Sequence, residues 1–217
     1  MKLKKDDVLV FAGDSITDQG RAIPDGEGSS HTSNWGRGYV NLVGGYLGAE
    51  YPQLRIRVIN QGISGNQSAD LLARWDQDIL SPNPTWVVIF VGINDVWRKF
   101  DSPYQYETHV TPQTYENNLV TMVEKTLPTT GNIIFMTPYM IESNPADEMR
   151  QEMLLFCDVC KKVAARYDLP CLDLQAGFDK LLECTHPMYY GWDRIHPSIV
   201  GHTMISNTLL RYLEAMK

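Results

Sequence analysis

Short apolar runs alternate with helical patterns along this chain. Most of the runs are continuously apolar, which is typical of strands covered on both faces rather than of edge or one-sided strands. We therefore predict strands over residues 8–12, 56–59, 86–91, 133–136 and 171–174.

Between these runs the apolar residues recur every three or four positions, the period of a helix with one buried face. Three such stripes are present, and we expect their members to pack into the core rather than to bind ligands. The stripes are Trp35, Tyr39, Leu42, Val43, Tyr46 and Leu47; Tyr115, Leu119, Met122 and Val123; and Met149, Met153, Phe156, Cys160, Val163 and Tyr167.

The alternation of strand and helix predicts parallel strands joined by right-handed crossovers, and hence a three-layer α/β/α sandwich. The chain has 217 residues and no linker, repeat or low-complexity tract, so we expect a single domain over residues 1–217. Ligands bind outside the carboxyl ends of strands in an open parallel sheet. Residues 13–15, Gly62 and Asn94 follow the first three predicted strands, so we expect them to converge on one edge.

Composition and charge narrow the possible partners. The chain is 43% hydrophobic and 21% charged, as in ordinary globular proteins, and its net charge is -7. Such a surface repels a phosphate backbone, so we expect no nucleic-acid partner. No stretch approaches the roughly 18 apolar residues of a membrane helix, and no signal-peptide core lies near the start. We expect no membrane partner and a cytoplasmic location.

Two of the four cysteines form a C-x2-C pattern, Cys157 and Cys160. This spacing can indicate a metal or redox site. Here it falls inside a predicted helix, and no second Cys or His pair stands at ligand spacing. We therefore expect buried, reduced thiols, with no zinc and no disulfide.

A serine near one end and an aspartate and a histidine near the other supply the groups of a nucleophilic triad. Ser15 follows a predicted strand, and Asp193 precedes His196 by three residues. In a helical turn or tight loop the carboxylate can accept from Nδ1–H while Nε2 faces the serine. Two simpler interpretations stay open from these residues alone: Ser15 as a helix cap, and His196 as a cap of the last helix.

Acyl transfer also needs donors for the oxyanion that develops on the carbonyl. The backbone N–H groups of Ser15 and Gly62 and the side-chain amide of Asn94 are the candidates, with Gly62 leaving room for the acyl group. A simple glycine at the strand exit is the alternative for Gly62. Asp14 and Asp95 are expected to organise their loops by accepting backbone hydrogen bonds.

Four segments carry a resemblance to a known family: residues 11–18, 60–66, 91–97 and 192–197, which contain Ser15, Gly62, Asn94 and His196. They resemble the blocks of the SGNH hydrolases, also called the GDSL esterase/lipase family. The second and third look most like those of carbohydrate O-acetyl esterases, notably acetylxylan esterases. The resemblance implies a flavodoxin-like strand order, an acyl-enzyme on Ser15, no metal or organic cofactor, and self-association into a homo-oligomer.

The substrate is expected to be a small acyl ester, acetyl foremost, on a small molecule or an oligosaccharide such as a xylo-oligosaccharide. Trp35, Trp97 and Trp192 lie beside the motifs, and flat aromatic faces suit sugar rings. The segment 19–34 is expected to wall the pocket, and the other histidines to be surface or structural. A thioesterase or lysophospholipase using the same triad, and a non-catalytic carbohydrate-binding module, stay open as alternatives.

Overall fold

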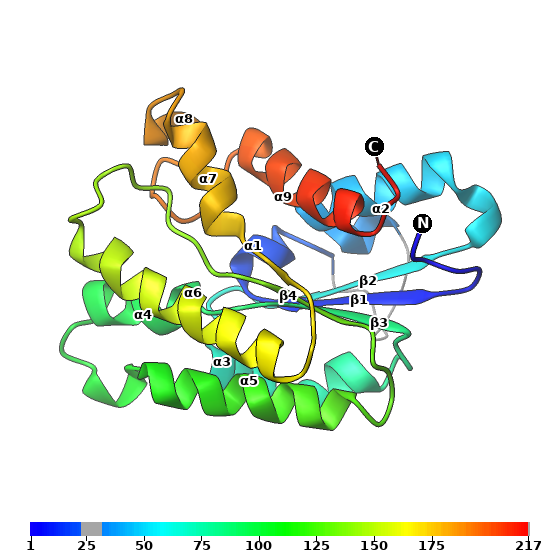
Figure 1. The fold of residues 1–217 in the computed structure, drawn as a ribbon, viewed down its shortest axis with the longest axis horizontal. Helices are drawn as coiled ribbons and strands as arrows, with labels where there is room; N and C mark the ends of the chain where they lie inside the picture. Colours follow the sequence, from blue (N-terminus) through cyan, green and yellow to red (C-terminus); the bar gives the residue numbers. More distant parts are fainter. Residues whose placement is uncertain (23–31, 217) are drawn as a thin grey trace.

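The computed structural model describes residues 1–22 and 32–216, and in this part of the chain a five-stranded sheet lies between two layers of helices (Figure 1). All neighbouring strands are parallel, and their order is β2-β1-β3-β4-β5. This confirms the three-layer sandwich and the flavodoxin-like order. The strands are β1 (Val8–Gly13), β2 (Arg57–Gly62), β3 (Trp86–Phe90), β4 (Ile133–Met136) and β5 (Cys171–Leu172).

Helices cover both faces of the sheet. In Figure 1, α2, α7, α8 and α9 gather on one face and α3, α4, α5 and α6 on the other, and the contacts within each group agree with this arrangement. The helices are α1 (Ser15–Asp18), α2 (Tyr39–Glu50), α3 (Ser68–Ala73), α4 (Ile93–Asp101), α5 (Pro112–Thr126), α6 (Glu148–Arg166), α7 (Leu174–Leu182), α8 (Pro187–Tyr190) and α9 (Ile199–Tyr212). Shorter turns of helix are η1 (Thr32–Trp35), η2 (Pro52–Leu54), η3 (Trp75–Leu80) and η4 (Tyr106–Thr108).

The predicted strands are confirmed; β1 and β3 differ from the prediction by one residue at their carboxyl ends, and β2 and β5 differ by more. The run at 56–59 continues to Gly62, because β2 stays paired with β1 until Gly62 lies opposite Gly13. The run at 171–174 ends after Leu172. Asp173 stops it by capping α7, its Oδ1 accepting the Ala176 N–H at 3.0 Å.

The core lies between the sheet and its two helical layers. All residues of β1, β3 and β4 are buried, as the continuous apolar runs predicted. The helical stripes supply the other side of each interface, since most of their members are buried on α2, α5 and α6. No helix in the described ranges is both long and apolar enough to cross a membrane.

The strand order decides where three of the predicted site segments meet. β1 pairs with β2 on one side and with β3 on the other. The chain therefore leaves β1 toward one side of the sheet for β2 and returns to the other side for β3. A crevice forms outside the carboxyl ends of strands at such a switch point. At this edge Ser15 follows β1, Gly62 ends β2 and Asn94 follows β3.

Candidate active site

Ser15 begins α1, the short helix directly after β1. Asp14 caps this helix, its Oδ1 accepting the Ile16 N–H at 3.0 Å. Gly13 has no room for a side chain, because a β-carbon there would lie 2.2 Å from Thr17 Oγ1. The first N–H groups of a helix have no partner within it. The turn therefore presents the Ser15 hydroxyl and the Ser15 N–H together at the sheet edge.

Residues from opposite ends of the chain meet at this turn. Ser15 Oγ lies 2.8 Å from His196 Nε2, and His196 Nδ1 lies 2.6 Å from Asp193 Oδ2. An ionised carboxylate only accepts hydrogen bonds, so Nδ1 carries the proton and Nε2 can accept from the serine hydroxyl. This is the arrangement of a Ser-His-Asp triad. The structure thus brings together the three residues that the sequence singles out.

Asp193 is held in place by more than the imidazole. Its Oδ1 accepts the backbone N–H groups of Ile195 at 3.0 Å and His196 at 2.8 Å. Burial opposes ionisation of this carboxyl, but the hydrogen bonds from His196 and from the two backbone N–H groups outweigh it and lower the pKa of Asp193. The negative charge that orients His196 is therefore present at neutral pH.

The loop between Asp193 and His196 is fixed to a second loop, residues 137–147. Arg194 has a left-handed φ of 68°, and its carbonyl accepts the Ile141 N–H at 2.8 Å. Its guanidinium lies 2.8 Å from Glu142 Oε2 and 2.9 Å from Asp147 Oδ2. Burial opposes ionisation of both carboxyls, yet Arg194 and nearby N–H groups keep the pKa of each below its ordinary value.

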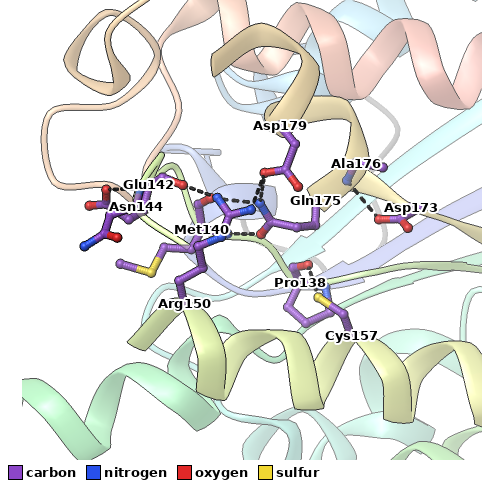
Figure 2. Close-up of polar contacts among 10 residues, drawn as sticks. All are labelled: Pro138, Met140, Glu142, Asn144, Arg150, Cys157, Asp173, Gln175, Ala176 and Asp179. Carbon is purple, nitrogen blue, oxygen red and sulfur yellow. Dashed lines mark hydrogen bonds and ion pairs between the residues drawn. The ribbon is translucent and has the colours of Figure 1, made fainter. Parts of the chain in front are cut away.

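Figure 2 shows how this second loop is anchored to α6 and α7. Gln175 accepts the Met140 N–H at 2.7 Å and donates to the Met140 carbonyl at 3.2 Å. Asp179 accepts from Gln175 at 2.8 Å and from Arg150 at 2.9 Å. Arg150 also donates to the Glu142 carbonyl. The loop that holds Arg194 is thereby tied to two helices.

Asn94 is the second residue of α4 and is 1% exposed. Its Nδ2 donates to the Asn66 carbonyl at 3.0 Å, and its Oδ1 accepts from Arg98 Nη2 at 3.0 Å. An amide nitrogen carries two hydrogens, and the bond to Asn66 uses one of them. Asn94 can therefore offer a donor at the carboxyl end of β3.

Gly62 has a different role from the one expected. Its N–H already donates to Asn60 Oδ1 at 2.9 Å, and its carbonyl accepts from Arg21 Nε at 2.6 Å. A β-carbon at this position would lie 2.2 Å from the Asp18 backbone nitrogen. Gly62 is thus required by the close approach of α1 to β2, not by space for an acyl group. The expectation that Gly62 donates to an oxyanion is corrected, because its N–H has an internal acceptor.

The turn that follows β2 contains a second glycine. The Asn66 N–H closes this turn onto the Ile63 carbonyl at 3.2 Å, with Gly65 at its third position and a φ of 85°. Such a turn requires glycine there, and its closing bond leaves the N–H of the third residue unused. Ser64 ties the turn to α1, its hydroxyl donating to Asp18 at 2.8 Å.

Gly65 is the candidate donor that sequence reasoning did not single out. It is exposed, whereas Gly62 is buried, and the carbonyl of the next residue, Asn66, holds the Asn94 amide. The available signal was a second glycine within the same segment, 60–66. Local sequence could not decide between the two glycines, because the choice depends on which N–H a distant part of the chain or a side chain already uses.

The interpretation of Asp14 and Asp95 as loop organisers is confirmed. Asp95 accepts the Ser68 N–H at 2.9 Å and also the Ser68 hydroxyl, which fixes the start of α3. Both carboxyls are almost fully buried. Burial raises the pKa of Asp14 to about 7 and that of Asp95 to about 6, against the hydrogen bonds that favour the charged forms.

The three candidate tryptophans lie in different surroundings. The Trp97 ring meets the His196 ring edge to face, with centroids 5.9 Å apart. Trp192 is 79% exposed, one residue before the triad aspartate. Trp35 instead donates its indole N–H to the Val58 carbonyl at 2.9 Å and packs against the core. The structure therefore brings Trp97 to the triad, leaves Trp192 largely exposed next to Asp193 in the chain, and places Trp35 in packing.

The remaining histidines match the structural role expected of them where they are described. Buried His202 accepts the Tyr39 N–H at 3.2 Å, and burial lowers the pKa of His202 to about 4. His186 caps α8, and His109 Nε2 donates to the Ser102 carbonyl at 3.2 Å, at the end of α4. His31 and most of the expected pocket wall at 19–34 lie outside the described residues.

The C-x2-C cysteines are buried thiols, as expected. Cys157 Sγ lies 3.0 Å from the Pro138 carbonyl and Cys160 Sγ lies 3.8 Å from the Met136 carbonyl. Burial raises the pKa of Cys157 to about 12. Within residues 1–22 and 32–216, no group of three or more His, Cys, Asp or Glu side chains is placed to hold a metal ion.

Known proteins resemble this chain over nearly its whole length. The chain is 46% identical over 211 residues to an acetylxylan esterase of Geobacillus stearothermophilus, covering 97% of this chain and 95% of that protein. The crystal structure of Axe2, an acetylxylan esterase from the same organism, matches with a TM-score of 0.93 and 45% identity, covering 98% and 96% of the two chains. Other structures of Axe2 are described as catalytic mutants in which a serine, a histidine or an aspartate is replaced by alanine.

A further solved structure is LAE5, an alpha/beta hydrolase from the metagenome of Lake Arreo, Spain. It matches with a TM-score of 0.96 and 41% identity, covering 100% of this chain and 99% of LAE5. Residues 11–204 match the model of the GDSL-like Lipase/Acylhydrolase family, a span that includes Ser15, Asn94, Asp193 and His196. The chain therefore belongs to the GDSL-like lipase/acylhydrolase family.

Proposed function

We propose that this protein is a serine esterase that removes acetyl groups from carbohydrates such as xylo-oligosaccharides, through an acyl-enzyme on Ser15. The single observation that carries the proposal is the continuous hydrogen-bond chain from Ser15 through His196 to Asp193. A hydroxyl is a weak nucleophile until an adjacent base takes its proton. His196 is placed to act as that base, and Asp193 fixes its tautomer.

The first half of the reaction forms the acyl-enzyme. Ser15 Oγ attacks the ester carbonyl carbon while His196 Nε2 takes the hydroxyl proton, giving a tetrahedral intermediate with a negative oxygen. The carbon–oxygen bond to the sugar then breaks, and His196 gives its proton to the departing alcohol. The acetyl group is left on Ser15.

The second half repeats these steps with water. His196 removes a proton from a water molecule, whose oxygen attacks the acyl carbon and forms a second tetrahedral intermediate. The bond to Ser15 Oγ breaks as the serine regains a proton from His196. Acetic acid leaves, and every proton passes through residues of this chain.

The oxyanion is assigned to three donors: the N–H of Ser15, the N–H of Gly65 and Nδ2 of Asn94. Ser15 supports this role as the first residue of α1, where the N–H has no helical partner. Gly65 supports it through its turn geometry, and Asn94 through its second amide hydrogen. Loss of one such donor typically lowers kcat by about 10²–10³-fold.

Two observations support a carbohydrate ester as substrate. Relatives that cover nearly the whole chain are named acetylxylan esterases or acetyl-xylooligosaccharide esterases. Trp192 is largely exposed and directly precedes Asp193 in the chain, and Trp97 contacts His196. Flat aromatic faces of this kind pack well against sugar rings.

The nucleophile is tested with the Ser15→Ala variant. This variant should retain its fold, because Asp14 and not Ser15 caps α1, and should lose acetate release from p-nitrophenyl acetate and acetylated xylo-oligosaccharides. Ser81→Ala is the control. Ser81 is exposed and lies in the loop before the amino end of β3, whereas the candidate site lies at the carboxyl end. A fluorophosphonate should label the wild type and not Ser15→Ala. Retained turnover in Ser15→Ala would overturn the proposal.

The substrate class is tested by a matched panel. We expect kcat/KM for acetyl esters to exceed that for octanoyl esters, acyl thioesters and lysophospholipids, with acetylated xylo-oligosaccharides the best substrates. A preference for thioesters or lysolipids would assign the same triad to a different leaving group. Absence of both turnover and labelling would indicate a binding module.

A further inference from the structure

Arg98 lies one helical turn after Asn94 on α4. Its Nη2 donates to Asn94 Oδ1 at 3.0 Å, and its Nη1 pairs with Asp101. The oxygen end of the Asn94 amide is therefore bound to a cation that is itself held by a carboxylate. The Arg98 side chain is 26% exposed, so most of it is removed from water.

The two hydrogen-bond partners of the Asn94 amide fix its orientation, because one can only donate and the other can only accept. A guanidinium donates hydrogen bonds and never accepts them, and a backbone carbonyl accepts and never donates. Arg98 therefore requires the amide oxygen on its side, and the Asn66 carbonyl, 3.0 Å from Nδ2, requires the amide nitrogen on the other. A reversed amide would face both partners with the wrong atom. Because Asn94 is 1% exposed, water cannot replace either partner.

The guanidinium is also held by an aromatic ring that contacts the triad. Arg98 Cζ lies 4.7 Å from the centre of the Trp97 ring, and the Trp97 ring meets His196 edge to face. A cation over an indole face is a favourable contact. Arg98 thus connects the amide of Asn94 with the ring that packs on His196.

We propose that Arg98 is a positioning residue of the oxyanion site, which holds the Asn94 amide with Nδ2 toward the reacting carbonyl and strengthens Nδ2–H as a donor by binding the amide oxygen. This inference rests on the proposed esterase function and goes beyond it, because the hydrogen-bond partners of Arg98 are Asn94 and Asp101 and not a member of the triad. Its contribution appears when the oxyanion forms, so it should affect kcat more than KM.

The first test replaces Arg98 with side chains of different hydrogen-bonding capacity. Arg98→Met keeps the length but removes the donors, and should lower kcat for p-nitrophenyl acetate about tenfold, a fraction of the 10²–10³-fold loss of a whole donor, with little change in KM. Arg98→Lys should fall between Met and wild type. Arg98→Glu should be lower than Arg98→Met, because a carboxylate only accepts and favours the reversed amide.

The second test asks whether Arg98 acts through Asn94. Asn94→Ala should lower kcat about 10²–10³-fold, and adding Arg98→Met to Asn94→Ala should change kcat less than twofold, since interacting residues are not additive. A merely structural role would lower kcat by the same factor in both backgrounds. The control is Arg166→Met, because Arg166 also lies over a neighbouring ring, that of Tyr167, at the far end of α6. Arg166→Met should match the wild type.

The outcomes separate the two proposals. If Arg98→Met equals the wild type, or if its effect persists in Asn94→Ala, the role of Arg98 is overturned while Ser15 and the esterase remain. If Ser15→Ala keeps turnover, the esterase itself is overturned. Thermal unfolding is recorded for each variant. Should Arg98→Met not fold, Arg98→Lys replaces it: its kcat is measured alone and together with Asn94→Ala, and the same outcomes support or overturn the proposal.

Discussion

A β-carbon on Gly62 would lie 2.2 Å from the backbone nitrogen of Asp18, so β2 and α1 approach each other at a point where only glycine fits. Gly62→Ala should therefore lower the free energy of unfolding by about 3 kcal/mol, as overpacking a rigid contact does. Gly65 provides the matched comparison, because open space surrounds its missing β-carbon while its φ of 85° disfavours alanine.

Gly65→Ala should cost only about 1–2 kcal/mol, the strain of a left-handed residue. Urea unfolding of the two variants beside the wild type measures the difference. Equal stability of Gly62→Ala and Gly65→Ala would contradict the packing argument.

Asp193→Asn should reduce kcat by about 10³–10⁴-fold. The amide that replaces the carboxylate can keep its oxygen on the Ile195 and His196 N–H groups, which leaves its NH2 facing His196 Nδ1. That contact favours the tautomer with the proton on Nε2, which cannot accept from Ser15. Steady-state kinetics at saturating substrate measure the loss, and the secondary structure by circular dichroism should be unchanged. A loss below tenfold would show that Asp193 does not set the tautomer.

Asp14→Asn should make the free energy of unfolding fall less as pH rises. Burial raises the pKa of Asp14 to about 7, while an unfolded aspartate titrates near 3.8. Between these values the unfolded chain loses a proton that the folded chain retains, so the contribution of Asp14 to stability is lost as pH rises toward and through 7. The loss amounts to at most ~4 kcal/mol. Asparagine caps a helix as well as aspartate does, so the α1 cap should persist.

The Tm of Asp14→Asn relative to the wild type should therefore increase between pH 5 and pH 8. Differential scanning calorimetry at both pH values, on the same buffer series, tests this. A constant difference in Tm across the series is the contrary result.

His202→Gln should reduce the fall in the free energy of unfolding that occurs as pH drops below 6.5. Burial, together with the nearby His196, lowers the pKa of His202 to about 4 from the ordinary 6.5. As pH falls from 6.5 to 4, the unfolded chain gains a proton before the folded chain does, so the stability contributed by neutral His202 is lost over that window. It amounts to at most ~3 kcal/mol.

Urea midpoints of the wild type and His202→Gln at pH 4.5 and 7.5 provide the measurement. The variant should show the smaller drop between the two values, because glutamine does not titrate. The same drop in both proteins would show that His202 is not the group responsible.

Residues near each other in the chain could be assigned from the sequence. The continuous apolar runs identified β1, β3 and β4, and the three-residue spacing of Asp193 and His196 identified a pair that does form a hydrogen bond. The α1 cap by Asp14 followed from the preference of short polar side chains for nearby backbone N–H groups. Trp35, by contrast, was both a stripe member and a substrate candidate, and only its bond to the Val58 carbonyl decided for packing.

The sequence by itself determined the alternation of strands and helices and the chemical groups available for acyl transfer, because hydrophobic period and side-chain chemistry are local properties. The tertiary structure alone decided which glycine N–H already has an acceptor, which tryptophan packs against His196 and which cation binds the Asn94 amide oxygen. The physical reason is that a donor is available only if no other group has taken its hydrogen bond. Here the groups that take or leave those bonds, such as Asn60, Asn66 and Arg98, are selected by how α1, β2 and α4 meet at the sheet edge.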